Sequence, residues 1–240
     1  RNKVCLLLTH DHYPLPMKIL LVAATPLETE ILRNDLQMKE IRKDLFSFDS
    51  GRAQIHLLHT GIGMINTAFF LGDYLATNQP DLAINFGIAG SFDRQFALGD
   101  VVEIVIDHFS ELGAESPEGF LGLEKMGFPL INIDGQEIYN RLENPNPSTY
   151  PLPKVKAITV NKVHGLAHSI EQVENDWQPQ VETMESAAFF HAMQIRQIPC
   201  HVFRSLSNYV EVRNKSNWKI GLAVKNVQNF VFRNTLKGWI

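Results

Sequence analysis

The 240-residue sequence contains only two cysteines, Cys5 and Cys200, and no CxxC pair. Two cysteines this far apart give no disulfide framework, which is typical of a reducing compartment and favours a cytoplasmic location. Long apolar runs are also missing, because no stretch approaches the roughly 18 residues that span a bilayer. We therefore expect no membrane partner.

Positive charge is scarce and scattered along the chain. There are 22 Lys and Arg residues against 26 Asp and Glu residues, a formal net charge of −4, and no basic block stands out. This balance argues against a nucleic-acid partner. The nine histidines show no HxH or HExxH spacing, so no metal site is expected. The absence of a GxSxG motif argues against acyl transfer.

Short apolar runs alternate with helical patterns, which predicts an α/β fold built from βαβ-type units and a mainly parallel sheet. The expected strands and helices are strands at 18–24, 54–60, 81–86, 101–106, 154–160 and 201–206, and helices from Pro26 and at 68–75, 185–197 and 217–236. Residues 107–129 and 144–153 are expected to be long loops. With no repeat or linker, we predict one domain over 17–240, preceded by an N-terminal extension at 1–16.

Two glycine-containing segments follow predicted strands. They are Gly61-Ile62-Gly63 and Gly87-Ile88-Ala89-Gly90. Glycine at a strand end lets the backbone approach a ligand and exposes N–H groups, although two tight turns explain the pattern equally well. Because open α/β sheets bind ligands at strand ends, the two segments together favour one shared site.

Two glutamates lie at predicted helix starts. Glu28 follows the first strand, beside Pro26, where a carboxylate can act as a general base on water. Glu185 lies between Met184 and a run of small residues, where its two oxygens suit a sugar diol. Each glutamate has a simpler explanation as a helix-start residue stabilised by the helix dipole.

Polar residues end the strand at 201–206. Ser207 and Asn208 are placed to read a ligand at a strand end, or to form an ordinary turn. Arg204, inside that strand, is interpreted as structural rather than catalytic. His164, near another strand end, is also interpreted as structural.

The order and spacing of several segments resemble the nucleoside phosphorylase and nucleosidase superfamily. The segments are MKILLVAATPLETEI, HTGIGMINTAFFL, DLAINFGIAGSF, VETMESAAFFHA and FRSLSNYVEVRNKSNWKI. The resemblance implies a single-domain, three-layer α/β fold with a mixed central sheet flanked by helices, usually in a homo-oligomer. It implies a small-molecule purine nucleoside as ligand, and no metal or organic cofactor.

The same resemblance implies roles for individual residues. Glu28 would lie near the attacking water, Met184 and Glu185 at the ribose, and Asn208 at the purine, with Glu28 and Asn208 catalytic. The base would also contact Ala89, Gly90, Val160 and Ser207, and the loops near the anomeric carbon would be Gly61, Ile62, Gly63 and Ile88.

Two features narrow the expected reaction. The loop from Ala24 to Glu28 has no arginine for phosphate and offers a carboxylate instead, which points to hydrolysis. Adenine-specific nucleosidases resembling this chain end the motif in Ser-Asp, whereas this chain has Asn208. An amide can donate to O6 and accept from a proton at N7, which suggests a 6-oxopurine.

The string SNYVEVRNKSNWKI, with AITVNKVHG upstream, resembles the futalosine hydrolase branch. That branch implies release of hypoxanthine from futalosine in menaquinone biosynthesis. The alternatives are a methylthioadenosine/S-adenosylhomocysteine nucleosidase, a purine nucleoside phosphorylase, and a nucleoside-binding module without activity.

Overall fold

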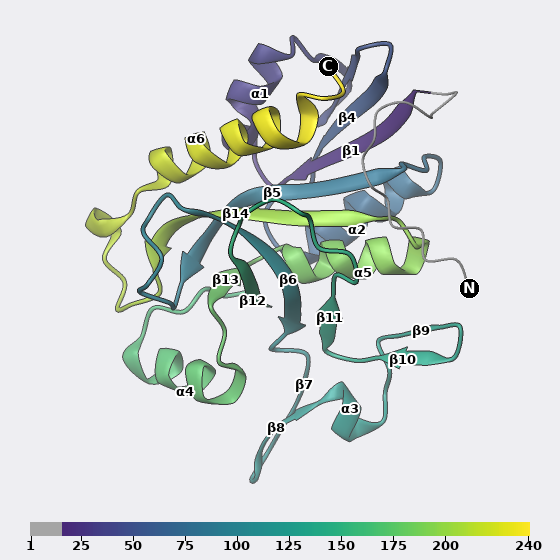
Figure 1. Ribbon diagram of the computed structural model, residues 1–240. Helices are drawn as coiled ribbons and strands as arrows, with labels where there is room; N and C mark the ends of the chain where they lie inside the picture. The colour runs from purple at the N-terminus through teal and green to yellow at the C-terminus, as the bar shows by residue number, and fades with distance from the viewer. Residues whose placement is uncertain (1–15) are drawn as a thin grey trace.

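The protein is a mixed α/β structure in which helices cover both faces of a central sheet (Figure 1). The computed structural model describes residues 16–240, so the expected extension at 1–16 lies outside the described residues except for Pro16. The predicted fold class, with a mixed central sheet flanked by helices, is confirmed. No helix within residues 16–240 is long and apolar enough to cross a membrane.

Four parallel strands form the centre of the sheet. In spatial order they are β4 (Ala53–His59), β1 (Met17–Ala23), β5 (Leu82–Ser91) and β14 (Cys200–Tyr209). Antiparallel strands β3 (Leu45–Asp49) and β2 (Lys39–Arg42) extend the sheet beyond β4. The parallel strands bring Ala23, His59 and their successors to the same edge, as the sequence predicts.

The other half of the sheet curls back onto β5. Strand β6 (Val101–Phe109) pairs antiparallel with β14 and parallel with β12 (Lys154–Thr159), and β11 (Arg141–Glu143) lies on the edge of β6. Strand β13 (Val181–Thr183) pairs with β12 and, antiparallel, with β5. The sheet therefore closes into a ring formed by β5, β14, β6, β12 and β13. In this ring β13 pairs with the end of β5, at Gly90 and Ser91.

Alternate residues of β1 face two separate cores. Ile19 and Leu21 pack toward α1 (Glu30–Asp35), α6 (Ile220–Phe230) and η3 (Val231–Leu236). Leu20 and Val22 pack toward α2 (Met64–Leu75) and α5 (Ser186–Arg196). Burial on both faces explains why the central strands are continuous apolar runs in the sequence.

The predicted loop at 107–129 is wrong. Strand β6 continues to Phe109, and a hairpin of β7 (Gly113–Ser116) and β8 (Gly119–Gly122) leads into α3 (Leu123–Met126). A second small hairpin, β9 (Ile131–Ile133) with β10 (Gln136–Ile138), follows. These elements have no fully buried face, so they lack the apolar periodicity on which the prediction depended. Helix α4 (Ala167–Trp177), with Val173 as its buried residue, was missed for the same reason.

Candidate active site

Glu28 lies in the short helical turn η1 (Pro26–Thr29), directly after β1. Its side chain is buried, and Oε2 accepts hydrogen bonds from the N–H and hydroxyl of Thr25 at 3.0 and 2.9 Å. The other oxygen, Oε1, accepts from the N–H of Ile88 on β5 at 3.2 Å. The contacts with Thr25 are those of a residue that caps the start of a helix, as considered from the sequence. The contact with Ile88 on β5 is additional, because capping does not require it.

Gly87 makes that reach possible. Strand β5 runs through Gly87-Ile88-Ala89-Gly90 and neither of its glycines has a positive φ, so the tight turn considered as an alternative is not formed there. A Cβ atom on Gly87 would lie 2.5 Å from Oε1 of Glu28. The glycine at position 87 is explained by close approach of a carboxylate to the strand, not by turn geometry.

Glu185 follows β13 at the N-cap position of α5 and makes no side-chain capping bond there. Its Oε1 instead accepts a hydrogen bond from the N–H of Gly63 at 2.9 Å. Gly61 and Gly63 have φ angles of 78° and 95°, so this segment is the glycine turn that the sequence predicts. Burial and the negative charge of Glu28 raise the pKa of Glu185, whereas Arg204 and the Gly63 N–H oppose that rise.

Arg204 is fully buried on β14 beneath the two carboxylates. Its Nη2 donates to Asn85 Oδ1 and its Nη1 to the carbonyl of Phe203, while Nε has no hydrogen-bond partner among the described residues. A Cβ atom on Gly87 would lie 2.5 Å from Glu28 Oε1 and 3.9 Å from Arg204 Nε. The Glu28 carboxylate and the Arg204 guanidinium therefore lie on the same side of β5. Burial lowers the pKa of Arg204, and the negative charges of Glu185, Glu28 and Asp107 raise it. These contacts agree with the interpretation of Arg204 as structural, and they add an electrostatic relation to both carboxylates that the sequence indicates only by a cation inside an apolar strand.

A β-bulge sets the position of Asn208 at the end of β14. The pairing of β14 with β5 shifts between Leu206 and Asn208, so that Ser207 is an extra residue and Asn208 stands opposite Gly90. Ser207 Oγ donates to Asn208 Oδ1 at 2.8 Å and is also 3.2 Å from the carbonyl of Ala89, and Asn208 Nδ2 donates to the carbonyl of Tyr209 at 3.0 Å. An amide has two N–H groups and two lone pairs on its oxygen, so Asn208 can still donate once and accept once.

The remaining predicted positions are placed as follows. Met184 is half-buried between Thr183 and Glu185, Ile88 is half-buried beside Glu28, and Ile62 is 58% exposed on the glycine turn. Val160 is fully buried against Ile158 and Val173, and its N–H donates to the carbonyl of Thr183. His164 pairs with the buried Glu182 through both its ring and its N–H, which agrees with a structural role.

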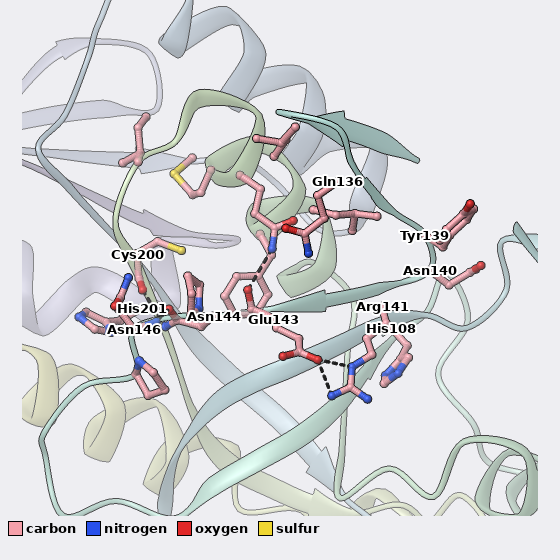
Figure 2. Close-up of a pocket in the computed structure, with 18 of the residues that line it drawn as sticks. His108, Gln136, Tyr139, Asn140, Arg141, Glu143, Asn144, Asn146, Cys200 and His201 are labelled. Carbon is pink, nitrogen blue, oxygen red and sulfur yellow. Dashed lines mark hydrogen bonds and ion pairs between the residues drawn. The ribbon is translucent and has the colours of Figure 1, made fainter. Parts of the chain in front are cut away.

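A large cavity of about 1760 Å³ lies elsewhere (Figure 2). Its lining includes Met17, Leu82 and Cys200, which begin β1, β5 and β14, so it is at the edge of the sheet opposite Glu28. Some of its polar side chains are paired with one another, as in Arg141 with Glu143, or with the backbone, as in Asn144 with the carbonyl of Cys200. Glu28 and Glu185 do not line this cavity, so the predicted site and the cavity are separate.

The sequence of residues 18–234 matches the Phosphorylase superfamily. The chain belongs to this superfamily. It is 28% identical over 182 residues to the futalosine hydrolase of Thermus thermophilus, covering 73% of this chain and 79% of that protein. It is 36% identical over 89 residues to a 5′-methylthioadenosine/S-adenosylhomocysteine nucleosidase of Chromohalobacter salexigens, covering 35% of this chain and 38% of that protein.

Solved structures share the fold. The native futalosine hydrolase of Helicobacter pylori superimposes with a TM-score of 0.73 at 14% identity, covering 90% of this chain and 96% of that one. The 5′-methylthioadenosine/S-adenosylhomocysteine nucleosidase of Neisseria meningitidis, in complex with methylthio-immucillin-A, gives 0.72 at 15% identity, covering 89% and 96%. The predicted resemblance is confirmed, and so is the prediction of an enzyme that hydrolyses N-glycosidic bonds, because these relatives are nucleosidases.

Proposed function

We propose that this enzyme hydrolyses futalosine, releasing hypoxanthine and dehypoxanthine futalosine, a step of menaquinone biosynthesis. The observation that carries hydrolysis is the placement of Glu28. Its carboxylate occupies the N–H groups of Thr25 and Ile88, donors that would otherwise be open to an anion. With Glu185 close enough to act on it electrostatically, the site repels phosphate and can accept a proton from water.

The reaction then proceeds from the contacts of three side chains. Glu185 accepts hydrogen bonds from the ribose 2′- and 3′-hydroxyls while Gly63 holds one of its oxygens. The bond from the anomeric carbon to N9 breaks with its electron pair staying on the base. N7 of the base takes a proton from solvent, and the proton that Glu28 later takes from the attacking water replaces it. Asn208 stabilises that base by accepting from N7–H and donating to O6. Glu28 removes a proton from the attacking water while the oxygen of that water bonds to the anomeric carbon.

The base contacts complete this proposal. Ala89, Gly90 and Ser207 surround Asn208 through the bulge, and Val160 contributes backbone at the end of β12, since its side chain is covered. Gly63 and Ile88 bind the two carboxylates through their N–H groups, and with Gly61 and Ile62 they form the proposed surroundings of the anomeric carbon. Met184 packs beside Glu185 at the sugar.

A substrate panel tests the proposal. Purified enzyme is assayed with futalosine, inosine and methylthioadenosine, each with and without inorganic phosphate, and free base is measured by chromatography. We expect hypoxanthine from futalosine at a rate independent of phosphate. Adenine from methylthioadenosine as the preferred reaction would favour the second candidate, which the Chromohalobacter relative supports. Phosphate-dependent release would overturn hydrolysis, and absence of any base release would indicate a binding module.

We also propose that the enzyme is a homo-oligomer that buries the start of α2. Three large apolar side chains project there, with exposed fractions of 58% for Ile62, 80% for Ile65 and 68% for Phe69. A contiguous apolar surface beside a ligand site is typical of a subunit contact. Light scattering on the wild type and on Phe69→Glu measures the mass, and a monomeric wild type would contradict this.

A further inference from the structure

Asp107, near the end of β6, is a fully buried carboxylate with no ion-pair partner among the described residues. Its Oδ1 accepts a hydrogen bond from the N–H of His108 at 2.7 Å. Its Oδ2 accepts from two hydroxyls, those of Ser186 and of Thr159, the latter at 2.9 Å. Because a buried charge is costly unless hydrogen bonds satisfy it, this arrangement requires a reason.

The hydroxyls connect Asp107 to the first turn of α5. The N–H of Ala187 donates to Thr159 Oγ1 at 2.9 Å, and the N–H of Ser186 is 3.4 Å from Thr183 Oγ1. The first N–H groups of a helix have no partner within it and are usually capped by the side chain of the preceding residue. Here that residue is Glu185, which makes no capping bond. Side chains from β12 and β13 replace it as the cap.

The hydrogens in this network have one consistent direction. Thr159 accepts from the helix N–H, so its own hydrogen is free to point to Asp107, and Ser186 likewise donates to Asp107. Burial raises the pKa of Asp107 to about 6, with the hydrogen bonds from Ser186 and Thr159 opposing the rise. Asp107 therefore accepts at the end of a chain of donors that begins at the positive end of α5.

We propose that Asp107 is a positioning residue for Glu185. By supporting the hydroxyls that cap α5, it leaves the carboxylate of Glu185 free to bind Gly63 and face the sugar. This inference rests on the proposed function for its catalytic consequence, because it assigns Glu185 to the ribose. Its structural part concerns only the hydrogen bond between Glu185 and Gly63.

Four variants separate positioning from general stability. Asp107→Asn places amide hydrogens where the network needs an acceptor, and Thr159→Val removes one hydroxyl, whereas Thr159→Ser keeps it. Glu103→Gln is the matched control, because Glu103 is also a fully buried carboxylate on β6 but bonds Lys154, His201 and Ser148 instead.

Two measurements are made on each folded variant. Amide hydrogen exchange by NMR reports the Gly63 and Ala187 N–H groups without any substrate. Steady-state kinetics with futalosine report kcat and KM, and are repeated for Asp107→Asn in a Glu185→Gln background. We expect Asp107→Asn and Thr159→Val to speed exchange at Gly63 at least tenfold and to raise KM, with Thr159→Ser and Glu103→Gln near wild type. In the Glu185→Gln background, Asp107→Asn should change kcat/KM less than threefold.

Unchanged exchange at Gly63 in folded Asp107→Asn would overturn the proposal. An undiminished effect of Asp107→Asn in the Glu185→Gln background would also overturn it, because Asp107 would then act by another route. If Asp107→Asn does not fold, Thr159→Val against Thr159→Ser decides the same question. A wild type that releases no base from any nucleoside refutes the proposed function, and the exchange measurement still decides the positioning.

Discussion

Adding one methyl group at Gly87 should displace the proposed general base, Glu28, while leaving its own chemistry unchanged. A Cβ atom at Gly87 would lie 2.5 Å from Glu28 Oε1, about 0.9 Å inside ordinary van der Waals contact. The strand cannot easily yield, since Gly87 is paired with Arg204 of β14, and β5 is also paired with β1 up to Asn85. The carboxylate must therefore move by about that distance and lose the Ile88 N–H. A misplacement of about 1 Å in a catalytic group costs on the order of 10²-fold in rate.

The assay for Gly87→Ala is the kcat for base release, with the unfolding midpoint measured alongside. We expect kcat to fall about 100-fold and the fold to persist, because φ at Gly87 suits an L-residue. Gly72→Ala is the matched control, since a Cβ there meets nothing within 4 Å and alanine favours a helix. Retention of kcat within threefold in Gly87→Ala would refute the placement of Glu28. Combination with Glu28→Gln should give little further loss.

Three other changes test separate parts of the structure. Glu28→Gln should lower kcat by about 10²–10⁴-fold, which is the usual contribution of a general base. The control Glu30→Gln, on the exposed face of the next turn, should keep a kcat near wild type. Equal kcat values for the two variants would remove Glu28 from its role. Asn208→Asp should lower kcat/KM for a 6-oxopurine nucleoside about 10- to 100-fold, because an ionised carboxylate cannot donate to O6. In competition assays this variant should prefer a 6-aminopurine nucleoside, whereas the wild type should prefer the 6-oxopurine nucleoside. Burial raises the pKa of Glu103, but hydrogen bonds from His201, Lys154 and Ser148 outweigh it and hold the pKa at about 2. A carboxyl whose folded pKa is depressed stabilises the fold above its unfolded pKa, so about 3 kcal/mol should be lost as pH falls from about 5 to about 2. Urea unfolding of wild type and Glu103→Gln should give free energies that converge on acidification, and a constant difference would contradict this origin.

The sequence was sufficient for the central strands because burial on both faces leaves long apolar runs. It failed where strands are half-exposed or short. Strands β2 and β3 and the hairpin of β7 with β8 depend on neighbours for their pairing, and Asp107 was placed in a loop because a charged residue interrupts the apolar pattern of β6. A buried carboxylate bound by hydroxyls from two other elements has no local signature.

The site shows a similar division. Glu28, Glu185 and Asn208 are each ambiguous in sequence, since each also suits a cap or a turn, and the resemblance to a family is what selected them together. For Gly87 the sequence left close approach and a tight turn as alternatives, because a glycine that admits a neighbouring carboxylate is indistinguishable from a turn glycine in one sequence. Arg204 was interpreted as structural, because its electrostatic interaction with Glu185 and Glu28 depends on burial that the sequence does not show. The division at residue 17 stays a prediction.

Both site carboxylates use backbone N–H groups, and this links the choice of reaction to the fold. Glycine turns and strand ends in α/β proteins offer exposed N–H groups that bind anions such as phosphate. In this enzyme Glu28 takes the N–H groups of Thr25 and Ile88, and Glu185 takes that of Gly63. The anion held by these loops is therefore supplied by the chain itself. A carboxylate fixed in such a cradle loses little freedom on binding substrate, and it faces the buried cation of Arg204. In the mechanism that we propose, the same cradle excludes phosphate and orients the base that activates water, so hydrolysis needs no additional residue.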